Sequence, residues 1–164
     1  MKKTMAHNID LILHNIRSAY NVGAIFRTAD GAGVRHIYLT GYTPSPPDGT
    51  RAYTTKPERM IIKTALGAHE YIPWTKHDDF ASVADVLHKN GVQIVALEQG
   101  EQSIAHNDFC VEHDVALVLG NEPTGIDRTT LEKCDTMIEI PMYGQKKSLN
   151  VSVAAGIALY GLIT

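Results

Sequence analysis

Short apolar runs alternate with stretches of helical periodicity along the whole chain. Residues 115–119, Val-Ala-Leu-Val-Leu, are apolar without interruption, a pattern typical of a strand buried on both faces of a sheet. Residues 21–31 instead repeat their apolar positions at helical spacing. By the same criteria, strands are predicted over residues 10–15, 35–40, 70–74, 92–97, 115–119 and 136–140. Helices are predicted over residues 21–31, 57–65, 79–90, 128–133 and 150–162. This alternation predicts an α/β fold, a mostly parallel sheet with helices on both faces.

Capping and turn residues support these boundaries. Pro57 falls in the first turn of its helix, where a missing N–H costs nothing. Asp78 or Asp79 is expected to cap the helix that ends before Gly91, and Asp127 to cap the next helix. The strand over residues 70–74 contains a proline and is therefore predicted at a sheet edge, whereas residues 115–119 are predicted to be central.

Composition restricts the class of protein. The 164 residues suit one domain, 1–164, and 44% apolar with 20% charged residues is typical of a soluble globular protein. No apolar run is long enough to cross a bilayer, and residues 1–8 lack the apolar segment of a signal peptide. Cys110 and Cys134 stand alone, so reduced thiols and a cytoplasmic location are expected.

Charge is distributed unevenly along the chain, although the net charge is only −3. Residues 1–63 hold nine Lys and Arg against four Asp and Glu, whereas residues 64–164 hold six against fourteen. The basic half is compatible with a phosphate-facing surface or with chance.

Three late strands end in similar polar, glycine-containing loops. These loops are residues 97–100, 119–125 and 140–144. Because the carboxyl ends of parallel strands share one sheet edge, the loops are expected to converge on one ligand. The pattern suits a flat, neutral group such as an adenosine. No GxGxxG, GxxxxGK[ST] or GxSxG motif is present, which argues against a dinucleotide fold, a P-loop and an α/β-hydrolase.

Several polar residues near these loops allow more than one interpretation. The loop 145–150 is either an ordinary connection with solvated lysines or a ligand loop at the start of a helix. Arg27 is either a surface residue paired with Asp30 or a phosphate fork. Glu122 is read as a turn carboxylate or an anchor for a helix start. The spacing His106, Cys110 and His113 matches no standard zinc pattern, so no metal is predicted.

Three segments together resemble the SpoU (TrmH-like) branch of the SPOUT RNA methyltransferases. They are Asn21-Val-Gly-Ala-Ile-Phe-Arg27-Thr-Ala, Leu117-Val-Leu-Gly-Asn-Glu122-Pro-Thr-Gly and Ile140-Pro-Met-Tyr-Gly-Gln-Lys-Lys-Ser148-Leu-Asn150-Val-Ser-Val-Ala-Ala. They occur in the family's order and span nearly the whole chain. The resemblance implies a C-terminal deep trefoil knot, an exception to the rule against threaded chains. It also implies a homodimer and methylation of a ribose 2′-hydroxyl in tRNA or rRNA with S-adenosyl-L-methionine.

The resemblance also implies site residues. The catalytic candidates are Arg27, Asn21, Glu122, Ser148 and Asn150. The cofactor-binding candidates are Leu97, Gly120, Glu122, Ile140, Met142, Leu149 and Asn150. Many relatives carry an RNA-binding extension, and no substantial one is expected in this chain. Target choice would then rest on surface cations, or on an accessory protein that docks the RNA; these cations are Arg17, Arg35, Arg51, Lys56, Arg59, Lys146 and Lys147. The alternative function is a catalytically silent RNA-binding or assembly factor on the same scaffold.

Overall fold

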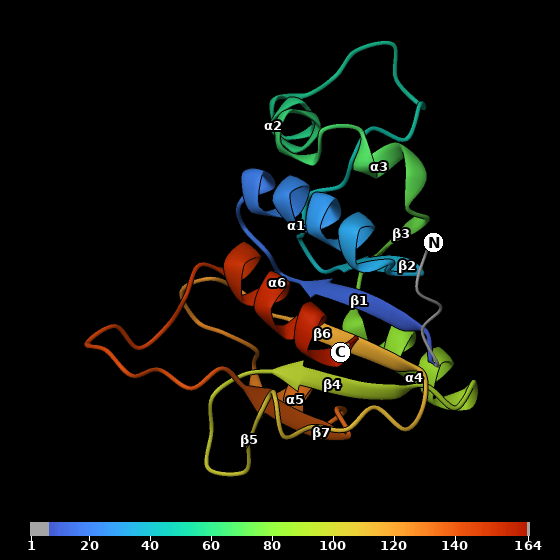
Figure 1. The fold of residues 1–164 in the computed structure, drawn as a ribbon. Helices are drawn as coiled ribbons and strands as arrows, with labels where there is room; N and C mark the ends of the chain where they lie inside the picture. Colours follow the sequence, from blue (N-terminus) through green and yellow to red (C-terminus); the bar gives the residue numbers. More distant parts are fainter. Residues whose placement is uncertain (1–6, 164) are drawn as a thin grey trace, which may run out of the picture.

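A computed structural model describes residues 7–163, so the expectation about the first residues of the chain lies largely outside the described part. Seven strands form one sheet in the order β3-β2-β1-β6-β4-β7-β5 (Figure 1). The strands are β1 (Ile9–His14), β2 (His36–Thr40), β3 (Trp74–His77), β4 (Gln93–Leu97), β5 (Ile104–Ala105), β6 (Val115–Leu119) and β7 (Thr136–Glu139). All the strand pairs in this sheet are parallel. The carboxyl ends of the strands therefore share one edge.

Helices cover both faces of the sheet, as the sequence predicts. On one face lie α1 (Ala19–Ala32) and α6 (Val151–Leu162), which pack against each other, and α2 (Lys56–Ala65) packs on the outer side of α1 (Figure 1). The short helix α3 (Ala68–Tyr71) also contacts α1. The other face carries α4 (Phe80–Lys89) and α5 (Arg128–Leu131).

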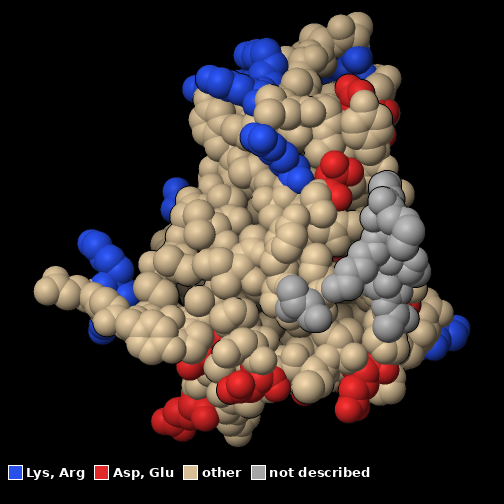
Figure 2. Space-filling view, viewed as in Figure 1, with Lys and Arg blue, Asp and Glu red and all other residues tan. Residues whose placement is uncertain are grey.

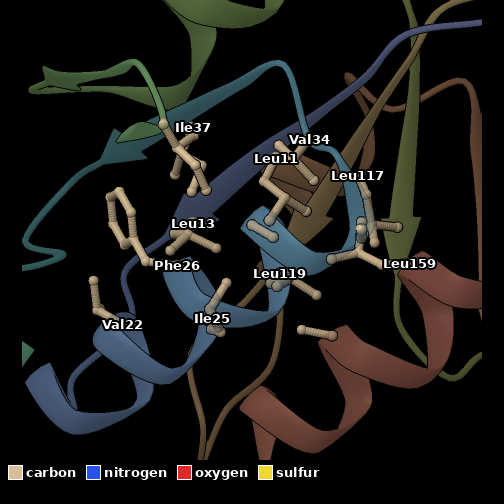
Figure 3. Close-up of a cluster of buried hydrophobic side chains, with 14 of the residues drawn as sticks. Leu11, Leu13, Val22, Ile25, Phe26, Val34, Ile37, Leu117, Leu119 and Leu159 are labelled. Carbon is tan, nitrogen blue, oxygen red and sulfur yellow. The ribbon is translucent and has the colours of Figure 1, made fainter. Parts of the chain in front are cut away.

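Successive side chains of each strand point to opposite faces of the sheet, so the apolar core is divided into two clusters, one on each face. Leu11 and Leu117 belong to the α1 and α6 side, in one cluster with Phe26 and Leu159, and Leu159 is seen beside Leu117 (Figure 3). Ile12, one position along the strand, packs on the α4 side. Because β6 is buried on both faces, its five residues are all apolar.

A glycine allows the close approach of α1 and α2. A Cβ added at Gly23 would lie 2.1 Å from Thr64 Oγ1 and 2.4 Å from the Ile61 carbonyl oxygen. The Thr64 hydroxyl then donates to the Tyr20 carbonyl at 2.9 Å, which ties the first turn of α1 to α2. This contact holds α2 beside the start of α1.

Most predicted elements are confirmed, with small shifts at their ends. β6 has the predicted bounds and lies fourth among the seven strands. Asp79 caps α4 and Asp127 caps α5, each accepting a backbone N–H. The strand predicted over residues 70–74 is wrong in position: α3 occupies its first half, and β3 begins at Trp74, after the proline. β3 does lie at the sheet edge.

Two further features differ in status between the sequence prediction and the structure. β5 has only two residues and was not predicted. The trefoil knot rests on the resemblance and stays a prediction. None of the helices formed by residues 7–163 has the length and apolar character needed to cross a membrane.

Candidate active site

The three glycine-containing loops meet in a pocket at the carboxyl edge of the sheet. Its volume is about 670 Å³, including the open mouth. The lining residues come from the ends of β4, β6 and β7 and from the start of α6: Leu97, Glu98, Gln99, Leu119, Gly120, Asn121, Glu122, Gly125, Glu139, Ile140, Met142, Ser148, Leu149, Val151 and Ala154. The parallel sheet thus brings together residues as far apart in sequence as Leu97 and Ala154.

The Glu122 carboxylate joins the pocket to the start of α1. Its Oε2 accepts the backbone N–H of Arg17 at 2.8 Å, and its Oε1 accepts that of Ser18 at 3.0 Å. The Asn21 side-chain amide also donates to Oε1 at 3.1 Å. Both oxygens are therefore engaged, and the carboxylate stabilises the first turn of α1, where backbone N–H groups are free.

These donors also fix the charge state of Glu122. Burial by itself raises the pKa of Glu122, but the backbone N–H groups of Arg17 and Ser18 and the Asn21 amide outweigh it. The net effect holds the pKa of this carboxyl below its ordinary value. A carboxylate with a lowered pKa and few free lone pairs is a poor proton acceptor, so the geometry favours a bracing role.

Asn150 links the same network to α6. Its amide donates to Asn21 Oδ1 at 3.2 Å, while its own Oδ1 accepts the Ser152 N–H at 2.8 Å and caps α6. The chain Glu122–Asn21–Asn150 thus joins one residue from each of the three resembling segments. The Asn150 side chain therefore both caps α6 and contacts the start of α1 through Asn21.

Glu98 and Gln99 belong to the predicted ligand loop 97–100 but were not singled out as site residues, and they hold the pocket loops together. Glu98 Oε2 accepts the Ile126 N–H at 2.9 Å, behind the turn at Gly125. The Gln99 amide donates to the Lys147 carbonyl at 2.7 Å, across the pocket mouth. Their position, as polar residues directly after an apolar strand, is the sequence signal that could have identified them.

Asn121 was also missed. Its amide donates to the Asn15 carbonyl at 3.0 Å and to the Tyr42 hydroxyl at 2.7 Å. Its Oδ1 accepts from the Thr124 N–H and hydroxyl. Asn121 thereby shapes the turn that presents Glu122.

The structure brings most predicted site residues together, with one exception. Every predicted cofactor residue except Asn150 lines the pocket, and so does Ser148. Asn21 and Asn150 line an adjoining groove with Glu122. Arg27 lies apart: it lines a separate groove between α1, α2 and the end of α6, with Lys63 and Tyr160. Within one protomer, Arg27 does not reach the pocket lining.

The predicted RNA-binding cations separate into two groups. Arg35 lies at the amino edge of the sheet, where it contacts the fully buried Asp10 at 2.6 Å and Asp114 at 2.9 Å. These carboxylates raise the pKa of Arg35, and they assign the residue a structural role away from the pocket edge. Arg51 is paired with Glu58 and lies over the Tyr53 ring. The remaining candidates have no ion pair within residues 7–163; they are Arg17, Lys56, Arg59, Lys146 and Lys147.

Basic and acidic side chains are unevenly distributed over the surface. Figure 2 shows several Lys and Arg over the end that carries α2, with some Asp and Glu beside them, and mainly Asp and Glu around the end that carries β5 and β7. The charged residues that line the pocket itself are all acidic: Glu98, Glu122 and Glu139. No group of three or more His, Cys, Asp and Glu within residues 7–163 is arranged to hold a metal ion.

This architecture defines an α/β protein with a ligand pocket where three strand ends meet. The chain belongs to the SpoU rRNA Methylase family, whose family model matches residues 8–160. The resemblance seen in the three sequence segments is thereby confirmed.

Relatives and solved structures agree with this membership. The chain is 36% identical over 160 residues to the 23S rRNA (guanosine-2'-O-)-methyltransferase RlmB of Coxiella burnetii, which covers 98% of this chain and 60% of the relative. The crystal structure of the A. aeolicus TrmH/SpoU tRNA modifying enzyme matches with a TM-score of 0.79 and 30% identity, over 96% of this chain and 74% of that one.

An AdoMet-bound rRNA methyltransferase from Sinorhizobium meliloti also matches, with a TM-score of 0.82 and 26% identity, over 96% of this chain and 56% of that one. The chain spans about three fifths of the length of the curated relatives it matches.

Proposed function

We propose that this protein transfers a methyl group from S-adenosyl-L-methionine to a ribose 2′-hydroxyl in tRNA or rRNA. The observation that carries the proposal is the Glu122–Asn21–Asn150 chain of hydrogen bonds, which joins all three family segments at the rim of the pocket. Family membership supports the chemistry, and the names of the relatives support an RNA substrate.

The pocket residues fit the cofactor. Leu97, Ile140 and Leu149 supply apolar surface from three loops for a flat adenine ring, and backbone groups beside them can bond its edges. No lysine or arginine of residues 7–163 lines the pocket, and its charged groups are carboxylates. Such a lining suits a ligand with a sulfonium and an ammonium group better than one with phosphates. Gly120 and Met142 complete the proposed cofactor set.

The cofactor supplies an electrophilic methyl group when bound, and the protein is left to align the ribose and manage one proton. Glu122 would brace the site, with Asn21, Ser148 and Asn150 orienting the ribose and the loop. Arg27 is an unsuitable base because a guanidinium does not deprotonate in proteins. In this proposal Arg27 clamps the phosphate beside the target ribose, and that phosphate accepts or relays the proton.

A homodimer would bring Arg27 into the site. The exposed side of α6 carries Val153, Ile157 and Tyr160, which are 51%, 38% and 48% exposed. Apolar side chains in such a row favour a protein contact. The Arg27 groove includes Tyr160, so a second copy packed on this face would receive Arg27 near its own pocket. The site would then be complete only in the dimer.

The first test is calorimetric titration with S-adenosyl-homocysteine. We expect the wild type to bind and Asn150→Ala to bind more weakly, because the variant loses the α6 cap and the bond to Asn21. Asn90→Ala, at the exposed end of α4, is the control and should bind as the wild type does. No binding by the folded wild-type dimer would favour the silent RNA-binding or assembly factor instead.

The second test is a methyl-transfer screen over tRNA and rRNA. The product is detected by alkaline hydrolysis, because the phosphodiester linkage that follows a 2′-O-methylated ribose is not cleaved. Arg27→Lys keeps the charge but loses the bidentate fork, so turnover should fall about tenfold or more while S-adenosyl-homocysteine affinity is kept. Near-normal turnover would contradict the clamp. Activity that needs an added cell extract would support an accessory protein.

A cytoplasmic location is part of the proposal, because both cysteines are unpaired thiols. Burial raises the pKa of Cys134 to about 12, which keeps that thiol protonated and unreactive.

A further inference from the structure

A hollow beside the first turn of α1 combines an aromatic ring with basic side chains. It is lined by Tyr20, Lys56, Arg59, Met60 and Lys63, and its volume is about 550 Å³. Tyr20 is 43% exposed, and Lys63 Nζ lies 6.0 Å from the centroid of its ring. Among the residues that the structure describes, no carboxylate lines the hollow. An exposed ring among cations is a surface that fits a nucleobase and its phosphates.

The basic side chains of this hollow are available for a ligand. None of the ion pairs found within residues 7–163 includes Lys56, Arg59 or Lys63. Arg59 donates one N–H group to the Thr54 carbonyl at 2.6 Å, which orients its guanidinium and leaves other donors free. Arg51, on the preceding loop, is instead paired with Glu58. The cations of the hollow therefore differ from Arg51, whose charge is neutralised by a carboxylate.

The position of the hollow connects it with the active site on two sides. Tyr20 directly precedes Asn21, whose amide bonds Glu122 at the pocket rim. Lys63 lines both this hollow and the groove that holds Arg27. Tyr20 also shares the exposed side of α1 with Arg27, because seven residues are about two helical turns. The hollow therefore lies beside two surfaces that the proposed function assigns to RNA: the pocket rim of the same copy, and the Arg27 groove, which would serve the pocket of the second copy.

We propose that Tyr20, with Lys56, Arg59 and Lys63, binds an unpaired nucleotide that flanks the methylated one. The base stacks on the Tyr20 ring, and the cations contact its two phosphates. The inference rests on the proposed function, since it assigns part of the RNA substrate to a surface that the methyl-transfer chemistry leaves unused. The subsite is sequence-tolerant because every base has a face that can stack.

The test uses a short single-stranded RNA that carries one 2-aminopurine, whose fluorescence is quenched by stacking. We expect quenching on wild type and on Tyr20→Phe, which keeps the ring. Tyr20→Leu keeps apolar bulk without a ring, so it should lose the quenching and bind the RNA about tenfold more weakly. S-adenosyl-homocysteine affinity and dimer mass should be unchanged in both variants.

The cations are tested by their effect on salt dependence. Replacing Lys56, Arg59 and Lys63 together by glutamine should flatten the plot of log affinity against log salt by roughly 0.7 for each phosphate that the variant no longer neutralises. The charge-matched control replaces Lys89, Arg128 and Lys133, which lie on or beside α4 and α5, and should leave the slope as it is.

Equal quenching with wild type and Tyr20→Leu would overturn the proposal. So would competition by polyglutamate that is as effective with Tyr20→Leu as with wild type, because the surface would then be a general anion site. Retained S-adenosyl-homocysteine binding with normal RNA affinity in Tyr20→Leu refutes the subsite alone. Failure of the wild type to bind S-adenosyl-homocysteine refutes the proposed function instead.

Discussion

The two edges of the sheet use carboxylates in opposite ways. At the amino edge, the fully buried Asp10 is neutralised by Arg35, which also contacts Asp114. At the carboxyl edge, the half-buried Glu122 accepts from two backbone N–H groups and one side-chain amide, and no cation among residues 7–163 pairs with it. The first arrangement is an ion pair that closes the fold. In the second, the Glu122 carboxylate keeps its negative charge while its hydrogen bonds hold the first turn of α1 in place. The nearby cations are then not used to neutralise it and can contact a ligand.

The largest effect is expected at the amino edge, from Arg35→Ala. The variant leaves the Asp10 carboxylate buried without its partner, so the free energy of unfolding should fall by about 3 kcal/mol. This is the low end of the range for buried pairs, because the Arg35 side chain is 43% exposed. Urea denaturation measures the change. Arg128→Ala, which breaks an exposed pair with Glu132, is the control and should cost under about 0.5 kcal/mol.

RNA affinity decides between the two roles considered for Arg35. Asp10→Asn combined with Arg35→Gln removes both charges, and the folded double variant should bind RNA as the wild type does. A clear loss of RNA affinity in a folded double variant would return Arg35 to the RNA-binding group.

At the carboxyl edge, Glu122→Gln should have a smaller effect on stability and a larger one on function. A glutamine can accept only through one oxygen, so it cannot serve the N–H groups of Arg17, Ser18 and Asn21 together. The free energy of unfolding should fall by about 1.5 kcal/mol, in line with hydrogen bonds to a charged group. Methyl transfer should fall more than tenfold, since the rim network positions Asn21. Unchanged turnover would refute the bracing role.

The same variant makes the pH dependence measurable. Because the folded pKa of Glu122 is depressed, its contribution to stability is complete above the unfolded value near 4.5 and is lost as pH falls through the folded pKa. The stability gap between wild type and Glu122→Gln should therefore be constant near neutral pH and close in acid. Urea titrations at successive pH values give this gap. The other carboxyl groups with a lowered pKa contribute equally to the stability of both proteins, so their contributions cancel in the difference. A gap that widens in acid would contradict the assignment.

Two helix caps allow a direct comparison between the pocket and the opposite helix layer. Asn150 caps α6 at the pocket, and Asp79 caps α4 away from it. Replacement of either by alanine should cost about 1 kcal/mol of unfolding free energy. Only Asn150→Ala should also weaken S-adenosyl-homocysteine binding. If Asp79→Ala weakened it equally, the effect of Asn150 would be one of general stability.

Much of the fold could be predicted because single residues carried strong local signals. The continuous apolar run of β6 required burial on both faces, and Asp79 and Asp127 capped the helices as expected. The error at residues 70–74 arose because tertiary contacts decide short segments: Ala68 packs into the core as a helix turn, and the strand starts after the proline.

The loops that form the site could be predicted from the sequence, but the hydrogen bonds between these loops could not. The convergence of three loops follows from a parallel sheet, whereas the Gln99 contact with Lys147 depends on how loops fold back. The separation of Arg27 from Asn21 could have been foreseen. Six residues along a helix turn side chains about 120° apart, so the two face different grooves.

The smallest effect on stability is expected from Lys146→Gln with Lys147→Gln. Both lysines are exposed on the loop before α6 and have no ion pair within residues 7–163, so the free energy of unfolding should change by under about 0.5 kcal/mol. RNA binding should weaken, and the salt slope should flatten by roughly 0.7 for each phosphate that these lysines neutralise in the wild type. Because Gln99 bonds the backbone of Lys147 and not its side chain, S-adenosyl-homocysteine binding should be kept. A stability loss as large as that of Arg35→Ala would mean that charges at both edges serve the fold, and the contrast between the edges would fail.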